Sequence, residues 1–64
     1  MQYGDIWVYE NNYKKDYYTC FGVHEDGYDL IETFTGEIYY SYDKETFKRA
    51  KLSGDWIFIC SIER

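Results

Sequence analysis

The spacing of apolar and polar positions divides the chain into five strand-like runs. Each run is rich in the β-branched and aromatic side chains that suit a pleated, half-buried surface. Polar or glycine-containing stretches separate the runs, which is typical of short antiparallel strands. The pattern predicts strands at residues 3–9, 16–23, 28–34, 37–42 and 56–62. The last run is apolar on both of its faces, so we expect it to lie inside a sheet and not at an open edge.

Turn-forming residues indicate hairpin connections between the middle runs. Asp26 and Gly27 stand between the second and third runs, and this dipeptide favours a tight hairpin. Thr35 and Gly36 mark the next turn, and the Asn-containing polar stretch at residues 10–15 predicts a loop after the first run. The three middle runs are therefore expected to form an antiparallel meander.

Between the fourth and fifth runs the apolar spacing changes to that of a helix. Phe47 and Ala50 lie three positions apart, and Asp43 is placed to cap a short helical segment at residues 44–51. The predicted fold class is therefore all-β with one short helical turn, in the order β-β-β-β-short helix-β. That order is typical of a small five-stranded barrel, in which the curled sheet covers its own core and exposes fewer edges.

The same order of elements resembles a known class of small barrels. Residues 4–8 (Gly-Asp-Ile-Trp-Val), the glycine-centred meander, the helical turn between Ser41 and Phe47 and the hydrophobic last strand are similar to SH3-like small barrels, including those of bacterial phages and mobile elements. The resemblance covers nearly the whole chain and implies a five-stranded SH3-like barrel. Because the chain contains no proline, the peptide-binding SH3 signature is absent, and the resemblance assigns no functional residue.

Length and composition indicate one domain over residues 1–64. The chain is too short for two domains, and nine Tyr, four Phe and two Trp supply the large side chains that so small a core needs. The expected core residues are Trp7, Phe21, Leu30, Ile38, Phe47, Ile57 and Ile59, followed by Val8, Val23 and Phe58. Cys20 and Cys60 stand in apolar runs without metal or redox spacing, so we expect buried, reduced thiols; a disulfide between them and a reactive thiol are the alternatives.

Acidic residues are concentrated in the middle of the chain. The formal net charge is −5, yet residues 16–43 contain seven acidic side chains and no Lys or Arg. Exposed tyrosines interleaved with carboxylates suit a surface that binds a basic protein. The expected partner-binding residues are Glu25, Asp26, Tyr28, Asp29, Glu32, Glu37, Tyr39 and Tyr40. A merely solvated exterior is the alternative, and a narrower binding hypothesis is mimicry of nucleic acid toward a nucleic-acid-binding protein.

No arrangement of catalytic or metal-binding residues is recognisable in the sequence. The single histidine, His24, stands in a predicted turn beside two carboxylates, which are too few ligands for a metal site. No serine has the setting of a nucleophile, and no phosphate-binding or dinucleotide motif occurs, so no cofactor is expected. The expected function is therefore a non-enzymatic binding module.

Other features suit other classes of function. Clustered exposed tyrosines suit a homo-oligomer such as a homodimer, and a Tyr-lined pocket would suit a small ligand. Lys44, Lys48 and Lys51 share one side of the predicted helix, where they would contact a single-stranded nucleic acid, although the acidic excess disfavours direct binding. The chain has no run of about 18 apolar residues and no apolar leader at its start, so we expect no membrane association and a cytoplasmic location.

Overall fold

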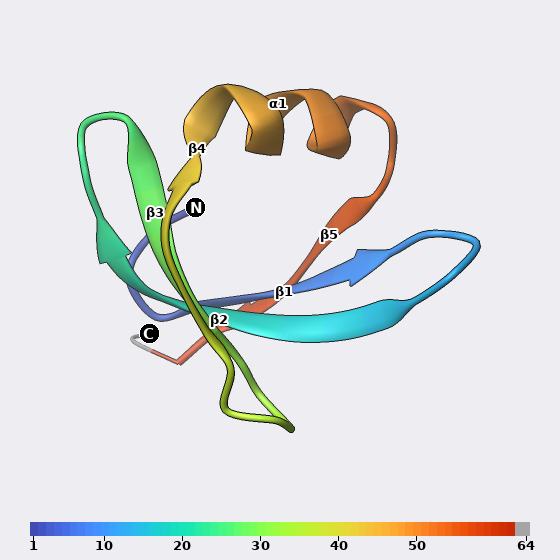
Figure 1. Ribbon diagram of the computed structural model, residues 1–64, viewed down its shortest axis with the longest axis horizontal. Helices are drawn as coiled ribbons and strands as arrows, with labels where there is room; N and C mark the ends of the chain where they lie inside the picture. The colour runs from blue at the N-terminus through green and yellow to red at the C-terminus, as the bar shows by residue number, and fades with distance from the viewer. Residues whose placement is uncertain (63–64) are drawn as a thin grey trace.

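The computed structural model describes residues 1–62 and is mostly β, with five antiparallel strands in one sheet and one short helix (Figure 1). The strands are β1 (Asp5–Glu10), β2 (Lys15–Val23), β3 (Gly27–Glu32), β4 (Ile38–Asp43) and β5 (Trp56–Ser61), and α1 (Lys44–Leu52) stands between β4 and β5. The predicted order of elements is therefore confirmed. No helix in this part of the chain has the length and apolarity that crossing a membrane requires.

The sheet is a meander whose last strand returns beside the first. The strand order is β4-β3-β2-β1-β5, so β4 and β5 are the two edges. Within residues 1–62 these edge strands form no ladder with each other, and the sheet is not closed into a barrel. The prediction that residues 56–62 lie inside the sheet is wrong, because β5 pairs only with β1. Apolar side chains on both faces of a strand indicate that both faces are shielded from water. They do not indicate how many neighbouring strands are hydrogen-bonded to it.

Glycine residues lie in several turns of the fold. Gly36, in the β3–β4 turn, has a φ of 75°, and Gly54, between α1 and β5, has a φ of 86°. These left-handed angles favour glycine because a Cβ atom would crowd the backbone. The β2–β3 turn closes at Gly27, whose carbonyl oxygen accepts a hydrogen bond of 2.8 Å from the His24 N–H. The predicted hairpins are thus confirmed.

The helix α1 bridges the two edge strands above the inner face of the sheet (Figure 1). The Asp43 carboxylate accepts a hydrogen bond of 2.9 Å from the Thr46 N–H, so Asp43 is the N-cap, as predicted. Phe47 is the buried residue of the helix, and its ring centroid lies 5.2 Å from that of Trp7. A capped first turn and one buried ring therefore hold the helix in place.

Aromatic rings dominate the core between the sheet and α1. The buried cluster comprises Trp7, Tyr18, Cys20, Tyr28, Leu30, Phe47 and Trp56. Phe47 makes edge-to-face contacts with both Trp7 and Tyr28, the geometry that the quadrupoles of aromatic rings favour. A few large rings therefore fill a core that the short chain could not fill with aliphatic side chains alone.

The predicted core is confirmed at some positions and wrong at others. Trp7, Val8, Leu30 and Phe47 are buried. Phe21 is only partly buried, and about half of the residue surface stays exposed at Val23, Ile38, Ile57, Phe58 and Ile59. Cys20 is buried as expected, whereas Cys60 is exposed, and both thiols are free. Most of the misplaced residues belong to the edge strands or to the outer face of the sheet, which no second layer of the described residues covers.

Candidate functional site

An open cavity of about 340 Å³ lies between the end of β1, the β1–β2 turn, β4, the start of α1 and β5. Its lining residues are Tyr9, Lys14, Tyr18, Leu30, Tyr39, Tyr42, Thr46 and Trp56, and we call this site the aromatic pocket. Its volume is at the lower end of the range for ligand sites. The pocket therefore suits one side chain of a partner or a small ligand.

Trp56 is the centre of the aromatic pocket. Its ring centroid lies 5.0 Å from that of Tyr9, 5.5 Å from that of Tyr18 and 5.8 Å from that of Tyr42. The Tyr18 and Tyr39 centroids are also 5.8 Å apart. Tyr9 faces Trp56 directly across the β1–β5 ladder, so strand register sets the contact. The pocket is thus a cage of ring faces and edges contributed by four strands.

A β-bulge in β4 places two of these tyrosines on the same face of the sheet. Tyr39 and Tyr42 are three positions apart, and a regular strand would point them to opposite faces. The β3–β4 ladder pairs Leu30 with Tyr39 but Tyr28 with Tyr42, so β4 carries one extra residue between them. Ser41 accommodates the extra residue with a φ of 56°, a left-handed angle that few residues other than glycine adopt.

Two phenol groups of the pocket, those of Tyr18 and Tyr42, stay protonated at neutral pH. Burial raises the pKa of Tyr18, and Asp16, which accepts a hydrogen bond of 3.4 Å from the Tyr18 hydroxyl, raises it further. Burial also raises the pKa of Tyr42, whose hydroxyl oxygen accepts a hydrogen bond of 3.2 Å from the Trp56 indole N–H. These two phenol groups therefore carry no charge at neutral pH.

Two carboxylates and one ammonium group stand at the rim of the pocket. Asp16 and Glu37 each accept a hydrogen bond from a pocket tyrosine, and the bond from Tyr39 to Glu37 is the main reason why the pKa of that phenol is raised. The Lys14 Nζ lies 3.3 Å from Asp16 Oδ2 and 5.3 Å from the centroid of the Tyr9 ring. A ring of the pocket thus already contacts a cation, and the rim has an excess of negative charge.

The structure separates the eight residues that the sequence predicts to bind a partner. Tyr28, Asp29 and Glu32 are buried, so they do not belong to an exposed surface. The exposed members are Glu25, Asp26, Glu37, Tyr39 and Tyr40. Of these, Glu37 and Tyr39 meet at the aromatic pocket, whereas the β2–β3 turn carries the first two. Tyr40 packs near Phe21, with ring centroids 6.1 Å apart.

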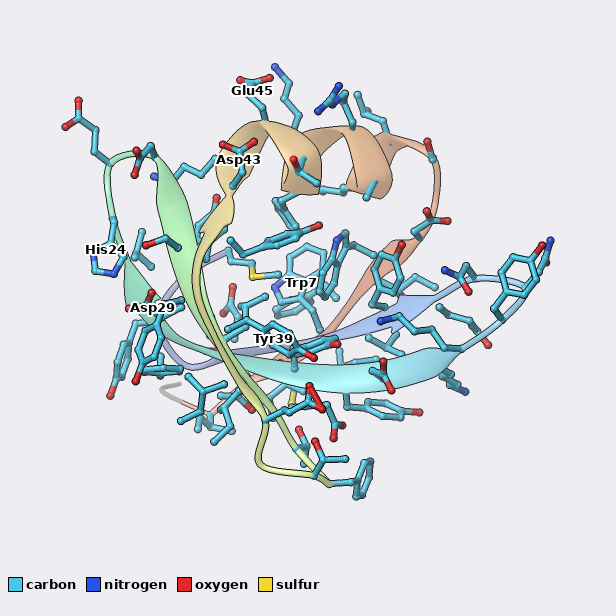
Figure 2. The ribbon with its side chains drawn as sticks, viewed as in Figure 1. Trp7, His24, Asp29, Tyr39, Asp43 and Glu45 are labelled. Atoms are coloured by element: carbon cyan, nitrogen blue, oxygen red, sulfur yellow. The ribbon has the colours of Figure 1, made fainter. Side chains whose placement is uncertain are left out.

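Asp29 and Glu32 satisfy backbone groups inside the fold. Asp29 accepts a hydrogen bond of 3.0 Å from the Ser41 N–H, and its other oxygen lies 2.6 Å from His24 Nε2 near the β2–β3 turn (Figure 2). The bond from Ser41, followed by that from His24, lowers the pKa of Asp29. Glu32 accepts bonds of 3.1 and 2.7 Å from two backbone N–H groups of the β3–β4 turn. Burial opposes the ionisation of Glu32, but its hydrogen bonds together lower its pKa.

Sequence reasoning missed most of the pocket. Tyr9, Tyr18, Tyr42 and Trp56 are absent from the predicted binding residues, although each is an aromatic residue in a predicted strand. The alternation of side chains between the two faces of the first two strands could have predicted two of them, because Tyr9 and Tyr18 lie on the inner face with Trp7. No such signal existed for Tyr42, since its orientation depends on the bulge.

Neither the arrangement of possible metal ligands nor similarity to known proteins assigns a function to the site. Among residues 1–62, no group of three or more His, Cys, Asp or Glu side chains is placed to hold a metal ion. The chain matches no protein-family model, no curated protein and no solved structure. The function must therefore be inferred from the chemistry of the pocket.

Proposed function

We propose that this chain is a non-enzymatic binding module of SH3-like architecture, whose aromatic pocket takes a cationic side chain from a basic protein. The observation that carries the proposal is the cavity of about 340 Å³ walled by tyrosine and tryptophan rings, with Asp16 and Glu37 at its rim. The net charge of −5 adds a longer-range attraction toward a basic surface.

Aromatic rings and carboxylates recognise cations in complementary ways. A cation over a ring face gains about 0.5–2 kcal/mol, and the gain increases as the contact loses water. Carboxylates at the rim provide charge-assisted hydrogen bonds to ammonium or guanidinium groups. A lysine or arginine side chain can therefore lay its apolar stem against the rings and keep its charged end near Asp16 and Glu37.

Lys14 is the cation that an incoming ligand would replace. Its side chain is 51% exposed, and it spans the Tyr9 ring and Asp16 at the mouth of the pocket. An exposed ion pair of this kind contributes little to stability, so its loss costs the fold little. A ligand cation that takes its place restores the charge partner of Asp16.

The pocket chemistry favours binding over catalysis. A nucleophile or general base needs a pKa close to the working pH. The pKa values of Tyr18, Tyr39 and Tyr42 are all raised, which keeps these hydroxyl groups protonated and unreactive. They act as hydrogen-bond donors and as ring surfaces.

Titration with short blocked peptides tests the proposal. The peptides differ only in one central residue, which is lysine, trimethyl-lysine, arginine, norleucine or glutamate, and tryptophan fluorescence reports binding because Trp56 lines the pocket. We expect dissociation constants of about 0.1–1 mM for the cationic peptides. We also expect them to bind about 2–30-fold more tightly than the norleucine peptide, as a cation–π contact predicts.

Adjacent tyrosines provide the matched variants. Tyr39→Leu removes a pocket ring, whereas Tyr40→Leu removes an exposed ring outside it. We expect Tyr39→Leu and Glu37→Gln to abolish the preference for the cationic peptides and Tyr40→Leu to leave it unchanged. Equal binding of norleucine and lysine peptides, or equal losses in the two tyrosine variants, would contradict the proposal.

A further inference from the structure

The strand β4 has an open edge beside the aromatic pocket. Its one neighbour among residues 1–62 is β3, so the other edge of β4 faces no strand of the described chain. Residues 38–40, which precede the bulge, are all exposed. Backbone N–H and C=O groups along such an edge are available to pair with a further strand.

The ladder with β3 determines which backbone groups of β4 point outward. The Glu32 N–H donates a hydrogen bond of 2.8 Å to the Glu37 carbonyl oxygen, so the Glu37 C=O group points to β3. Along an antiparallel ladder, residues that bond to the neighbouring strand alternate with residues whose backbone groups point away from it. The backbone groups of Tyr39 therefore point to β3, and those of Ile38 and Tyr40 point out of the sheet.

The bulge supports this assignment and limits the length of the open edge. The Ser41 N–H donates a hydrogen bond of 3.0 Å to Asp29 of β3. The C=O group of Tyr40, on the opposite side of the same planar peptide unit, therefore points away from β3. Ser41 then interrupts the regular strand with its φ of 56°. The open edge thus consists of the N–H and C=O groups of Ile38 and Tyr40, which suits an added strand of three residues.

A strand on this edge would direct one side chain into the aromatic pocket. Residues opposite each other in a ladder point to the same face. Tyr39 lines the pocket and is 42% exposed, so the residue opposite Tyr39 would point into the pocket. The Glu37 carboxylate accepts a hydrogen bond from the Tyr39 hydroxyl and is close to the same position. At the other edge, Trp56 of β5 is only 5% exposed and packs against Phe47 of α1, so β5 offers no such opening.

We propose, on the basis of the function proposed above, that the basic partner binds as an extended segment that pairs antiparallel with β4. A lysine or arginine of this segment lies opposite Tyr39 and enters the aromatic pocket. The residue before it exchanges two backbone hydrogen bonds with Tyr40, and the residue after it exchanges two with Ile38. The backbone bonds supply affinity and the pocket supplies specificity, which is the division of roles in other cases of strand addition.

Charge favours a basic segment over a second copy of the chain at this edge. A β4 strand of a second copy would bring another chain with a net charge of −5 and would place no cation beside Asp16 and Glu37. A basic segment instead places an opposite charge beside these two carboxylates. Its two neighbouring side chains would lie next to Ile38 and Tyr40 on the outer face, so we expect apolar residues on both sides of the cation.

Amide hydrogen exchange followed by NMR tests the added strand on the unmodified protein. The probe is a blocked five-residue peptide with a central lysine and a valine on each side of it. At a peptide concentration about ten times the dissociation constant, exchange of the Ile38 and Tyr40 N–H groups should slow about 10-fold. The Tyr39 N–H, which is directed to β3, and the N–H groups of β5 at the other edge should exchange as before.

Methylation of the peptide nitrogens tests the register from the side of the ligand. The residues before and after the lysine would donate their N–H groups to Tyr40 and Ile38, whereas the N–H of the lysine itself points away from β4. A methyl group on either neighbouring nitrogen removes a hydrogen bond and blocks the approach of the strands, so it should weaken binding about 10-fold or more. Methylation of the lysine backbone nitrogen is the matched control and should change the dissociation constant less than about 2-fold.

The outcomes separate the added strand from the cationic pocket. Unchanged exchange at Ile38 and Tyr40, or equal losses at the three nitrogens, with lysine still preferred over norleucine, would overturn the added strand and leave the proposed function standing. Slowed exchange with lysine and norleucine peptides of equal affinity would overturn the proposed function, and with it the cation opposite Tyr39. Exchange at Ile38 and Tyr40 that slows with protein concentration in the absence of peptide would place a second copy on this edge and would also overturn the proposal.

Discussion

The close approach of Gly22 to Asp29 supports a sharp test of how β2 and β3 are held together. The two residues are paired in the ladder, and a Cβ atom at Gly22 would overlap Asp29 Oδ2 and lie 3.0 Å from Cγ. The carboxylate has little freedom to move, because one oxygen accepts the Ser41 N–H and the other contacts His24. Gly22→Ala must therefore break one of these contacts or push the strands apart.

The magnitude follows from two opposing effects. Adding a carbon to a filled site costs about 1–3 kcal/mol. Replacing glycine by alanine in a strand recovers about 0.5–1 kcal/mol of backbone entropy, provided that the backbone angles suit both residues. No left-handed φ occurs at Gly22, so this gain applies. We expect a net loss of about 1–2 kcal/mol in the free energy of unfolding, or about 4–16 °C in Tm for a domain of this size.

Urea denaturation followed by tryptophan fluorescence measures the loss, because both Trp7 and Trp56 are buried. With a slope of about 1 kcal/mol per molar urea, the midpoint should fall by about 1–2 M. Asp29→Ala destabilises by itself, since it leaves the Ser41 N–H without its acceptor, but in that background Gly22→Ala should cost much less, because only the contact of 3.1 Å with the Cβ atom of residue 29 remains. The double-mutant cycle should therefore give a coupling free energy of about 1–2 kcal/mol.

Gly36→Ala is the matched control for this cycle. It has a φ of 75° and no atom within 4 Å of the position of its Cβ, so its cost comes from backbone strain alone. That cost should be the same with and without Asp29. A wild-type midpoint for Gly22→Ala, or an equally large loss in the Asp29→Ala background, would refute the idea that the carboxylate is fixed against Gly22.

Three further predictions concern ionisation and capping. The pKa values of Asp29, Glu32 and Asp43 are lowered in the folded chain, so these carboxylates stabilise the fold above the ordinary carboxyl pKa and cease to do so as the pH falls. The urea midpoint should therefore drop between pH 5 and about pH 3. A midpoint that does not change over this range would contradict the prediction. Asp43→Ala should remove the helix cap and lower Tm by about 4–8 °C, whereas Asp43→Ser should retain most of the stability in the same melting experiment. Because burial raises the pKa of Tyr18 and Tyr42, a spectrophotometric pH titration should show a group of phenols that ionises after the exposed ones, and one transition near pH 10 would argue against their burial.

The strands, turns and helix were predictable because their signals are local. Gly36 and Gly54 occur where left-handed backbone is required, and the Asp43 side chain reaches a helical N–H three residues later. Such features depend on a few neighbouring residues, so a single sequence reveals them. Leu30 of the third run was predicted to belong to the core and is buried, whereas Tyr28, two positions before it on the same face, was assigned to the binding surface and is buried as well.

The position of β5 was not predictable from its apolarity. Phe58 packs toward Trp7 on the inner face, with ring centroids 5.4 Å apart, whereas Ile57 lies opposite Val8 on the outer face. Both faces of the strand are apolar for this reason, even though one of its edges has no strand beside it. The hydropathy pattern of a strand indicates which of its faces are buried. It does not indicate whether the strand has a hydrogen-bonded neighbour on both edges.

The carboxylate of Asp29 links the fold to the aromatic pocket in a way that the charge of Asp29 does not reveal. The bulge in β4 breaks the regular ladder at Ser41, and the Ser41 N–H is bonded to Asp29 instead. The same bulge turns Tyr39 and Tyr42 to one face, where both line the aromatic pocket. An acidic residue that sequence reasoning assigned to the binding surface thus acts from inside the sheet, by stabilising the irregularity that assembles the pocket. Its loss should weaken binding of a cationic peptide through the geometry of the two tyrosines, and this weakening should persist at high salt, where the attraction between exposed charges is already screened.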